Sequence, residues 1–172
     1  MRPRPTQVAG VVDDRSMSGY DIAQLNVGRV VAPLDDVRLA GFVGWLDEIN
    51  ALAERSPGFV WRLQGESGNN TDLKVTADAL FIVNLSVWES VERLHAFTYA
   101  SGHKTVFARR FDWFERREGP NHVLWWLPKG TIPDVTDALF RLERLAELGP
   151  TPEAFTFKPR FPSPVAPWTA SE

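Results

Sequence analysis

The chain has 172 residues, no cysteine and a formal net charge of -3. This length suits one domain, and the lack of cysteine excludes disulfides, thiolate nucleophiles and cysteine-ligated metal centres. The weak acidity argues against a nucleic-acid-binding surface. No apolar run approaches the roughly 20 residues of a membrane helix, and no hydrophobic signal peptide opens the chain. We therefore expect a cytoplasmic protein that binds neither nucleic acids nor membranes.

Both ends of the chain are expected to lie outside the fold. Residues 1–19 begin with Arg2-Pro3-Arg4-Pro5, in which each proline disfavours helix at the preceding residue. Residues 163–172 are rich in proline and poor in large apolar side chains. We expect one domain over residues 20–162, with a C-terminal tail and an N-terminal arm that is either flexible or loosely packed on the domain.

The first half of the chain predicts three strands and one helix. Apolar and polar residues alternate over 20–28, which places Leu25 and Val27 on one face and Gln24 and Asn26 on the other. An apolar stripe at helical spacing predicts a helix from about 35, capped by Asp35 or Asp36, to a stop at Pro57-Gly58. Strands are predicted over 59–64 and 80–88, joined by a turn-rich loop.

The second half predicts two helical regions and two strands. A helical region from 90 to 117 is expected to be interrupted at Gly102. A strand over 122–127 follows, and then a helix capped by Thr131 that ends at Gly149-Pro150. Weak alternation over 154–161 predicts a strand at the sheet edge, because it contains a proline.

This order predicts an α+β fold. It is β-α-β-β-α-β with an added helix and edge strand, and its first six elements match the ferredoxin-like arrangement of one antiparallel sheet covered by helices. We expect the helices to leave bare the sheet face that carries polar residues. That face would then meet a second subunit, a ligand or both.

Several segments of the chain resemble one bacterial family. In order they are Ala23-Gln24-Leu25-Asn26, Phe59-Val60-Trp61-Arg62-Leu63, Asn84-Leu85-Ser86-Val87-Trp88-Glu89, Phe97-Thr98-Tyr99, His103, Trp113-Phe114, Trp125-Trp126 and Gly149-Pro150-Thr151. The family is a domain of unknown function and is similar to the dimeric α/β-barrel proteins, whose kin include antibiotic-biosynthesis monooxygenases. The resemblance covers about residues 21–161.

The resemblance implies a fold and an assembly but no reaction. It implies a dimeric α/β barrel, formed by a homodimer through the sheet. The superfamily spans cofactor-free oxygenases, haem proteins, isomerases and proteins without known catalysis. The fold therefore cannot name the chemistry.

The second helical region carries the candidate catalytic residues. His95, Tyr99, His103, Arg110 and Trp113 share one stripe at helical spacing, if Gly102 does not break the register. His103 or His95 would act as a base, and Tyr99 would donate a hydrogen bond to the substrate. The alternative is that these rings pack on the sheet and the histidines bond to backbone carbonyls.

The polar sheet face supplies the candidate substrate-binding residues. They are Asn26, Trp61, Asn84, Ser86 and Trp88, to which Arg110 is added from the helical stripe. Buried amides need partners, which a ligand in a wet cavity would provide. A dimer interface or ordered water would provide hydrogen-bond partners for these amides equally well. Arg109-Arg110 and Arg116-Arg117 otherwise indicate a solvated helix face with local ion pairs.

The sequence predicts no metal site and no cofactor. Its three histidines lack metal-ligand spacing, although His95 or His103 as a single axial ligand leaves haem open. We expect a small-molecule enzyme with cofactor-free, monooxygenase-like or proton-transfer chemistry on an aromatic or polyketide-like metabolite. The alternatives are a non-catalytic ligand-binding or accessory protein and a haem-binding protein.

Overall fold

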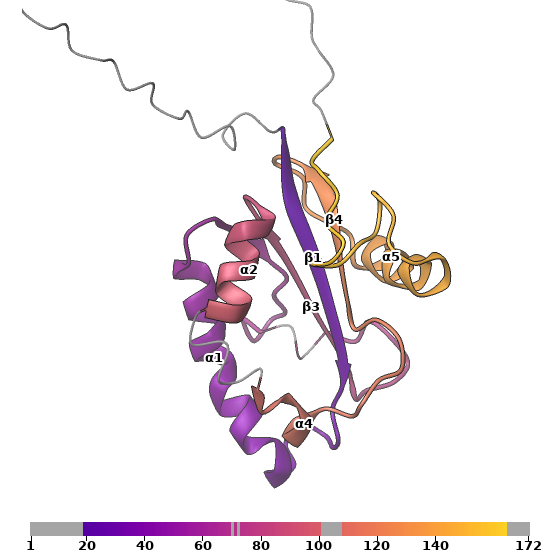
Figure 1. Ribbon diagram of the computed structural model, residues 1–172. Coiled ribbons are helices and arrows are strands. Elements are labelled where there is room, and N and C mark those ends of the chain that lie inside the picture. Colours follow the sequence, from indigo (N-terminus) through magenta and orange to yellow (C-terminus); the bar gives the residue numbers. More distant parts are fainter. Residues whose placement is uncertain (1–18, 70, 72, 101–107, 165–172) are drawn as a thin grey trace, which may run out of the picture.

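The computed structural model describes residues 19–69, 71, 73–100 and 108–164. Figure 1 shows the elements in chain order: β1 (Tyr20–Arg29), the 3-10 turn η2 (Val37–Leu39), α1 (Ala40–Arg55), β2 (Phe59–Arg62), β3 (Phe81–Trp88), α2 (Val91–Ala100), α4 (Arg110–Trp113), β4 (His122–Pro128) and α5 (Val135–Leu148). Most of the expected arm and tail lies outside the described residues. The domain boundaries at 20 and 162 therefore stay predictions.

Four antiparallel strands form one sheet in the order β2-β3-β1-β4. This confirms the predicted α+β class. The predicted edge strand over 154–161 is wrong, because this segment makes only the isolated bridges Leu124–Phe155 and Thr151–Ala154. Thr151 and Ala154 hydrogen-bond to each other through their backbone N–H and C=O groups in a tight turn, so these groups do not pair with a strand. Pro159 has no backbone N–H to donate.

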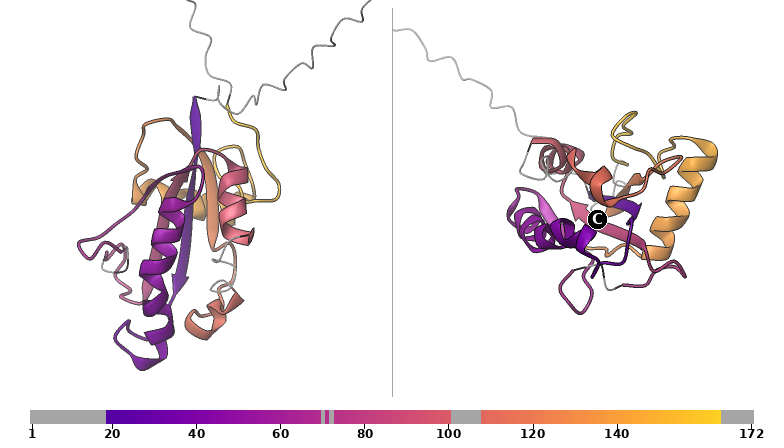
Figure 2. Two further views of the ribbon diagram at one scale, coloured as in Figure 1. Left: turned by 90° about the vertical axis from the view of Figure 1, so that its left-hand side faces the viewer. Right: turned by 90° about the horizontal axis from the view of Figure 1, so that it is seen from below.

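Helices cover both faces of the sheet, so the expectation of a bare polar face is wrong. Figures 1 and 2 show α1 and α2 on one side of the strands and α5 on the other. Leu142 and Leu145 of α5 pack on the aliphatic face with Leu25 and Leu85. The polar face instead lies beneath α1 and α2. The amphipathic α5 covers the aliphatic face, which was expected to lie under the earlier helices.

A bulge in β2 separates two aromatic residues that strict alternation would place on one face. Phe59 pairs with Trp88, whereas Trp61 pairs with Val87, and the register shifts between them. An extra residue in one strand reverses the facing of the residues after it. Phe59 therefore packs on the α1 and α2 side against Trp88, and Trp61 packs against the aliphatic cluster on the α5 side.

Aspartates begin two of the helical segments. Asp36 accepts a hydrogen bond from the Arg38 backbone N–H at 2.9 Å and caps η2, as predicted. Asp134, not Thr131, caps α5, because its carboxylate accepts from the N–H groups of Thr136 and Asp137. Within the described residues, no helix has the length and apolarity needed to cross a membrane.

Candidate functional site

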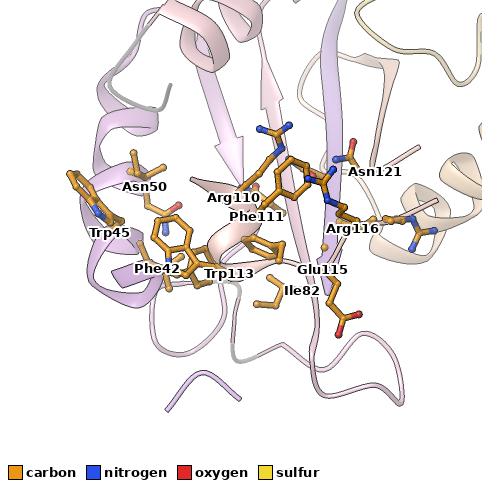
Figure 3. A pocket seen from close by; sticks show the side chains of 18 of the residues that line it. Phe42, Trp45, Asn50, Ile82, Arg110, Phe111, Trp113, Glu115, Arg116 and Asn121 are labelled. Carbon is orange, nitrogen blue, oxygen red and sulfur yellow. The ribbon is translucent and has the colours of Figure 1, made fainter. Parts of the chain in front are cut away.

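A cleft of about 400 Å³ lies between α1, one end of the sheet and the segment that begins with α4 (Figure 3). Its floor is formed by β1 and β3. One wall is the face of α1 that looks toward the sheet, and the other is formed by residues 110–121. A volume of this size is in the range of small-molecule sites.

The cleft floor carries a cross-strand pair of amides. Asn26 of β1 lies directly opposite Asn84 of β3, so both side chains project from the same face. Asn84 is exposed and Asn26 is half-buried. Within the described residues, no hydrogen bond of either side-chain amide is found. The pair therefore presents donors and acceptors to whatever enters the cleft.

A glycine lets an aromatic ring close one end of the floor. A Cβ atom on Gly28 would lie only 2.6 Å from Cδ1 of Phe114. Phe114 is held there by a backbone bridge to Val30 and by an edge-on contact with Phe42, whose ring centroid is 5.1 Å away. Only glycine at position 28 allows Phe114 to approach β1 this closely.

The α1 wall is apolar and aromatic. Phe42, Trp45 and Ile49 line it at helical spacing. The Phe42 ring also lies 5.9 Å from the Trp113 ring, which joins this wall to α4. Asn50 adds an amide, which donates to Asn69 at 2.6 Å. This wall offers flat apolar area of the kind that planar ligands bury.

The opposite wall is rich in arginine. Arg110, Arg116 and Arg117 line it with Glu115 as the accompanying carboxylate. Glu115 forms an ion pair with Arg29, which does not line the cleft. Three arginines thus line the cleft, in a chain whose formal net charge is -3.

The structure brings together only part of the predicted binding set. Asn26, Asn84 and Arg110 all line the cleft. Ser86 and Trp88 are instead buried core residues, and the Trp88 indole N–H donates to Ser86 Oγ at 3.1 Å. Trp61 lies on the other face of the sheet because of the β2 bulge.

The predicted catalytic stripe is divided between two places. His95 and Tyr99 of α2 do not line the cleft; their ring centroids lie 4.6 Å apart, and each contacts Phe157. Arg110 and Trp113 line the cleft from α4. His103 lies outside the described residues. Catalytic roles for His95, Tyr99 and His103 therefore stay predictions.

His122, which was not among the predicted site residues, lies next to the amide pair. It pairs with Asn26 across β1 and β4, so Asn84, Asn26 and His122 form a row on one face. Its ring contacts Phe157, and its Nδ1 lies 2.9 Å from Asn121 Oδ1. Its Nε2 is buried and has no hydrogen-bond partner among the described residues. Burial lowers the pKa of His122 below its usual 6.5. The strand register was the signal that could have found it.

A family model described as a domain of unknown function, DUF3291, matches residues 21–170. The chain belongs to the DUF3291 family. This confirms the resemblance on which the sequence analysis relied. The family's description names no activity, and a comparison with curated proteins gives no match.

Three solved structures show likenesses to this DUF3291 chain. SnoaB, a cofactor-independent oxygenase from Streptomyces nogalater, is 19% identical with a TM-score of 0.46, over 67% of this chain and 99% of its own. NE2512, a protein of unknown function from Nitrosomonas europaea, is 11% identical with a TM-score of 0.46, over 68% and 98%. PA3566 from Pseudomonas aeruginosa is 11% identical with a TM-score of 0.43, over 65% and 96%. These likenesses concern the fold alone.

The chemistry available in this DUF3291 cleft is binding and orientation. Its described lining offers amides, guanidinium groups, aromatic rings and one carboxylate, Glu115. Among the described residues, no group of three or more acidic or histidine side chains could hold a metal ion. Amides and arginines fix the position of a polar substituent, and aromatic walls bury a planar body.

Proposed function

We propose that this protein binds a small planar, largely apolar molecule in the cleft between α1 and the sheet. The observation that carries the proposal is the cross-strand pair Asn26–Asn84 on a floor walled by aromatic residues. A buried planar body would pack on Phe42 and Trp45, and its polar substituent would take up the hydrogen bonds of the two amides.

The exposure of a polar residue on a central strand supports a ligand-binding role. Asn84 is exposed at a central strand, β3, where its neighbours Val83 and Leu85 on the other face are 1% exposed. A central strand selected for stability alone would bury apolar side chains on both faces when helices cover both. An open cleft lined by amides adds little to stability and provides a place for a ligand.

The test is a binding assay with naphthalene compounds that differ in charge. We expect 2-naphthamide, 2-naphthoate or 2-naphthylmethylamine to quench tryptophan fluorescence, because Trp45 and Trp113 line the cleft, and to raise the melting temperature. The variant Asn84→Phe fills the floor and should abolish both effects.

Val60→Phe is the matched control for this assay. Val60 is 45% exposed on the edge strand β2 and does not line the cleft, so the same ring is added without filling the site. Loss of binding in Asn84→Phe with full binding in Val60→Phe supports the proposal. Equal binding by both variants, or no binding of any compound to the wild type, contradicts it.

Cofactor-free oxygenation is a second proposal for the same cleft. Guanidinium groups beside a bound phenol favour its phenolate, and an electron-rich phenolate is the form that reacts with dioxygen. In a balanced reaction, 1-naphthol and one O₂ give 1,4-naphthoquinone and one water. Arg110 is the described residue of the predicted site that would hold the phenolate oxygen. A proton-transfer rearrangement would use the same anion.

An oxygen electrode separates the catalytic proposal from binding alone. If the cleft is catalytic, 1-naphthol should be consumed together with oxygen and the quinone absorbance should rise, and Asn84→Phe should stop both. Binding of 1-naphthol without oxygen uptake would support the binding role alone and contradict oxygenation. The absorption spectrum of the purified protein tests the haem alternative, which the Soret band would reveal.

We also propose that two copies associate through the α5 side of the sheet. Trp61, Leu63, Val75 and Phe81 are only partly buried there, at the margin of the aliphatic cluster. Ile82 lines the cleft on the other face of the sheet and takes no part in this contact. Apolar area of this kind is typical of two-fold interfaces. Light scattering should show a dimer for the wild type and a monomer for Trp61→Glu.

A further inference from the structure

We propose that the arginine wall of the cleft selects ligands in which an oxyanion is attached to the apolar body. The inference rests on the proposed function, which requires only that a planar molecule binds. It adds the chemical class of the polar group: a carboxylate, or another oxyanion of similar geometry. It concerns Arg110 and above all Arg116, which the sequence analysis had interpreted as part of a solvated helix face.

Two arginines are placed over one aromatic ring at the cleft. The guanidinium carbons of Arg110 and Arg116 lie 4.2 and 4.4 Å from the centroid of the Phe111 ring. Figure 3 shows both side chains beside this ring. A cation over a ring face is attracted to it, which restricts long side chains that would otherwise be mobile. Less conformational entropy is then lost when the guanidinium groups bind a ligand.

The nearby carboxylates do not neutralise Arg116. Glu115 pairs with Arg29, and Figure 3 shows its carboxylate directed away from the two guanidinium groups. Asp112 pairs with Arg109 at 3.0 Å. Within the described residues, no ion pair of Arg116 is found. Its positive charge is therefore available to a ligand.

The shape of the guanidinium group favours an oxyanion over a neutral carbonyl. Its planar fork of N–H donors matches the two oxygens of a carboxylate, and such charge-assisted hydrogen bonds are about twice as strong as neutral ones. The chain as a whole carries a net charge of -3, so the excess of positive charge at this wall is local. An anion carried by the ligand would meet its counter-charge here.

The experiment compares two ligands of nearly the same shape. Dissociation constants of 2-naphthoate and 2-naphthamide are measured by tryptophan quenching and checked by thermal shift at low salt. We expect the wild type to bind 2-naphthoate about tenfold more tightly than 2-naphthamide, as one charge-assisted contact provides. Arg116→Gln should remove this preference, because it weakens the binding of 2-naphthoate far more than that of 2-naphthamide.

Arg144→Gln is the matched control variant. Arg144 is an exposed residue of α5, on the far side of the sheet, where its guanidinium lies over Phe140. Its removal changes the net charge of the protein as much as Arg116→Gln does. The control should keep the full preference for 2-naphthoate. A preference lost equally in both variants would reflect net charge and would overturn the inference.

The remaining outcomes separate this inference from the proposed function. Equal affinity of the wild type for the two compounds, with both lost in Asn84→Phe, overturns the oxyanion preference and leaves the binding function standing. No binding of either compound to the wild type overturns both. A preference for 2-naphthoate that is unchanged in Arg116→Gln overturns the assignment of the oxyanion contact to Arg116.

Discussion

The two faces of the sheet differ in how their burial changes along the strands. On the α5 face, Leu25, Leu85 and Val123 are at most 1% exposed and belong to one cluster with Leu142 and Leu145 of the helix. On the α1 and α2 face, the row Trp88–Ile22 is closed beneath α2, whereas the row Asn84–Asn26, four residues along each strand, opens into the cleft. The centre of one face is therefore a closed core, whereas the other face is a core at one end and a binding surface at the other.

One strand can thus serve stability and binding at the same time. Successive side chains of a strand point to opposite faces, so β1 and β3 contribute alternately to the dry core and to the cleft floor. Adjacent residues of the same strand should then respond very differently to truncation.

The largest effect is expected for Leu85→Ala against Asn84→Ala. Truncating the buried Leu85 should lower the free energy of unfolding by about 2–5 kcal/mol, because it leaves a cavity in the aliphatic cluster. Truncating the exposed neighbour Asn84 should change it by about 0.5 kcal/mol or less. Urea denaturation measures both. A comparable loss in the two variants would show that the cleft floor is as important for stability as the core.

A smaller effect is expected for Gly28→Ala against Gly44→Ala. The new methyl group at position 28 would clash with the Phe114 ring, so stability should fall by about 1–3 kcal/mol and 2-naphthoate should bind more weakly. Gly44 lies within α1, where a new methyl group would have no atom within 4 Å, so alanine there should stabilise the protein by up to about 1 kcal/mol. Equal stability of the two variants would mean that Phe114 moves without cost.

The smallest effect concerns pH and His122. Its pKa is lowered in the folded protein, so below pH about 6.5 the unfolded chain binds a proton that the folded chain does not. The free energy of unfolding should therefore fall as the pH drops from about 6.5 toward the folded pKa, by at most about 1.4 kcal/mol per pH unit. Denaturation at pH 7.5 and 5.5 should show a weaker pH dependence in His122→Phe. The same dependence in both proteins would exclude His122 as its source.

Much of the fold follows from local patterns in the sequence. Alternation in β1 and β3 predicts the correct facing of Leu25, Asn26 and Asn84, and Asp36 was expected to cap its helical segment. The pattern could not show which helix covers which face. The stripe of α5 fits either face, and the choice depends on how the chain after β4 turns back over the sheet.

The candidate site was predictable only in part. Asn26, Asn84 and Arg110 were identified because they are polar residues at positions facing a sheet or a helix stripe. Trp61 was misplaced because a bulge leaves no mark in the alternation of a four-residue strand. Arg116 was assigned to a solvated helix face. It is exposed, but its position over Phe111 depends on the turn after α4 and not on helical spacing.

The strand order also bears on how the protein avoids polymerising through its sheet edges. Of the two outer strands, β4 exchanges hydrogen bonds with Phe155, whose N–H and C=O both pair with Leu124. The other, β2, is only four residues long and is interrupted by its bulge. A covered edge and a short, irregular edge give another chain little regular backbone to extend. Concentrated solutions should therefore resist fibre formation, although the strands are rich in apolar residues.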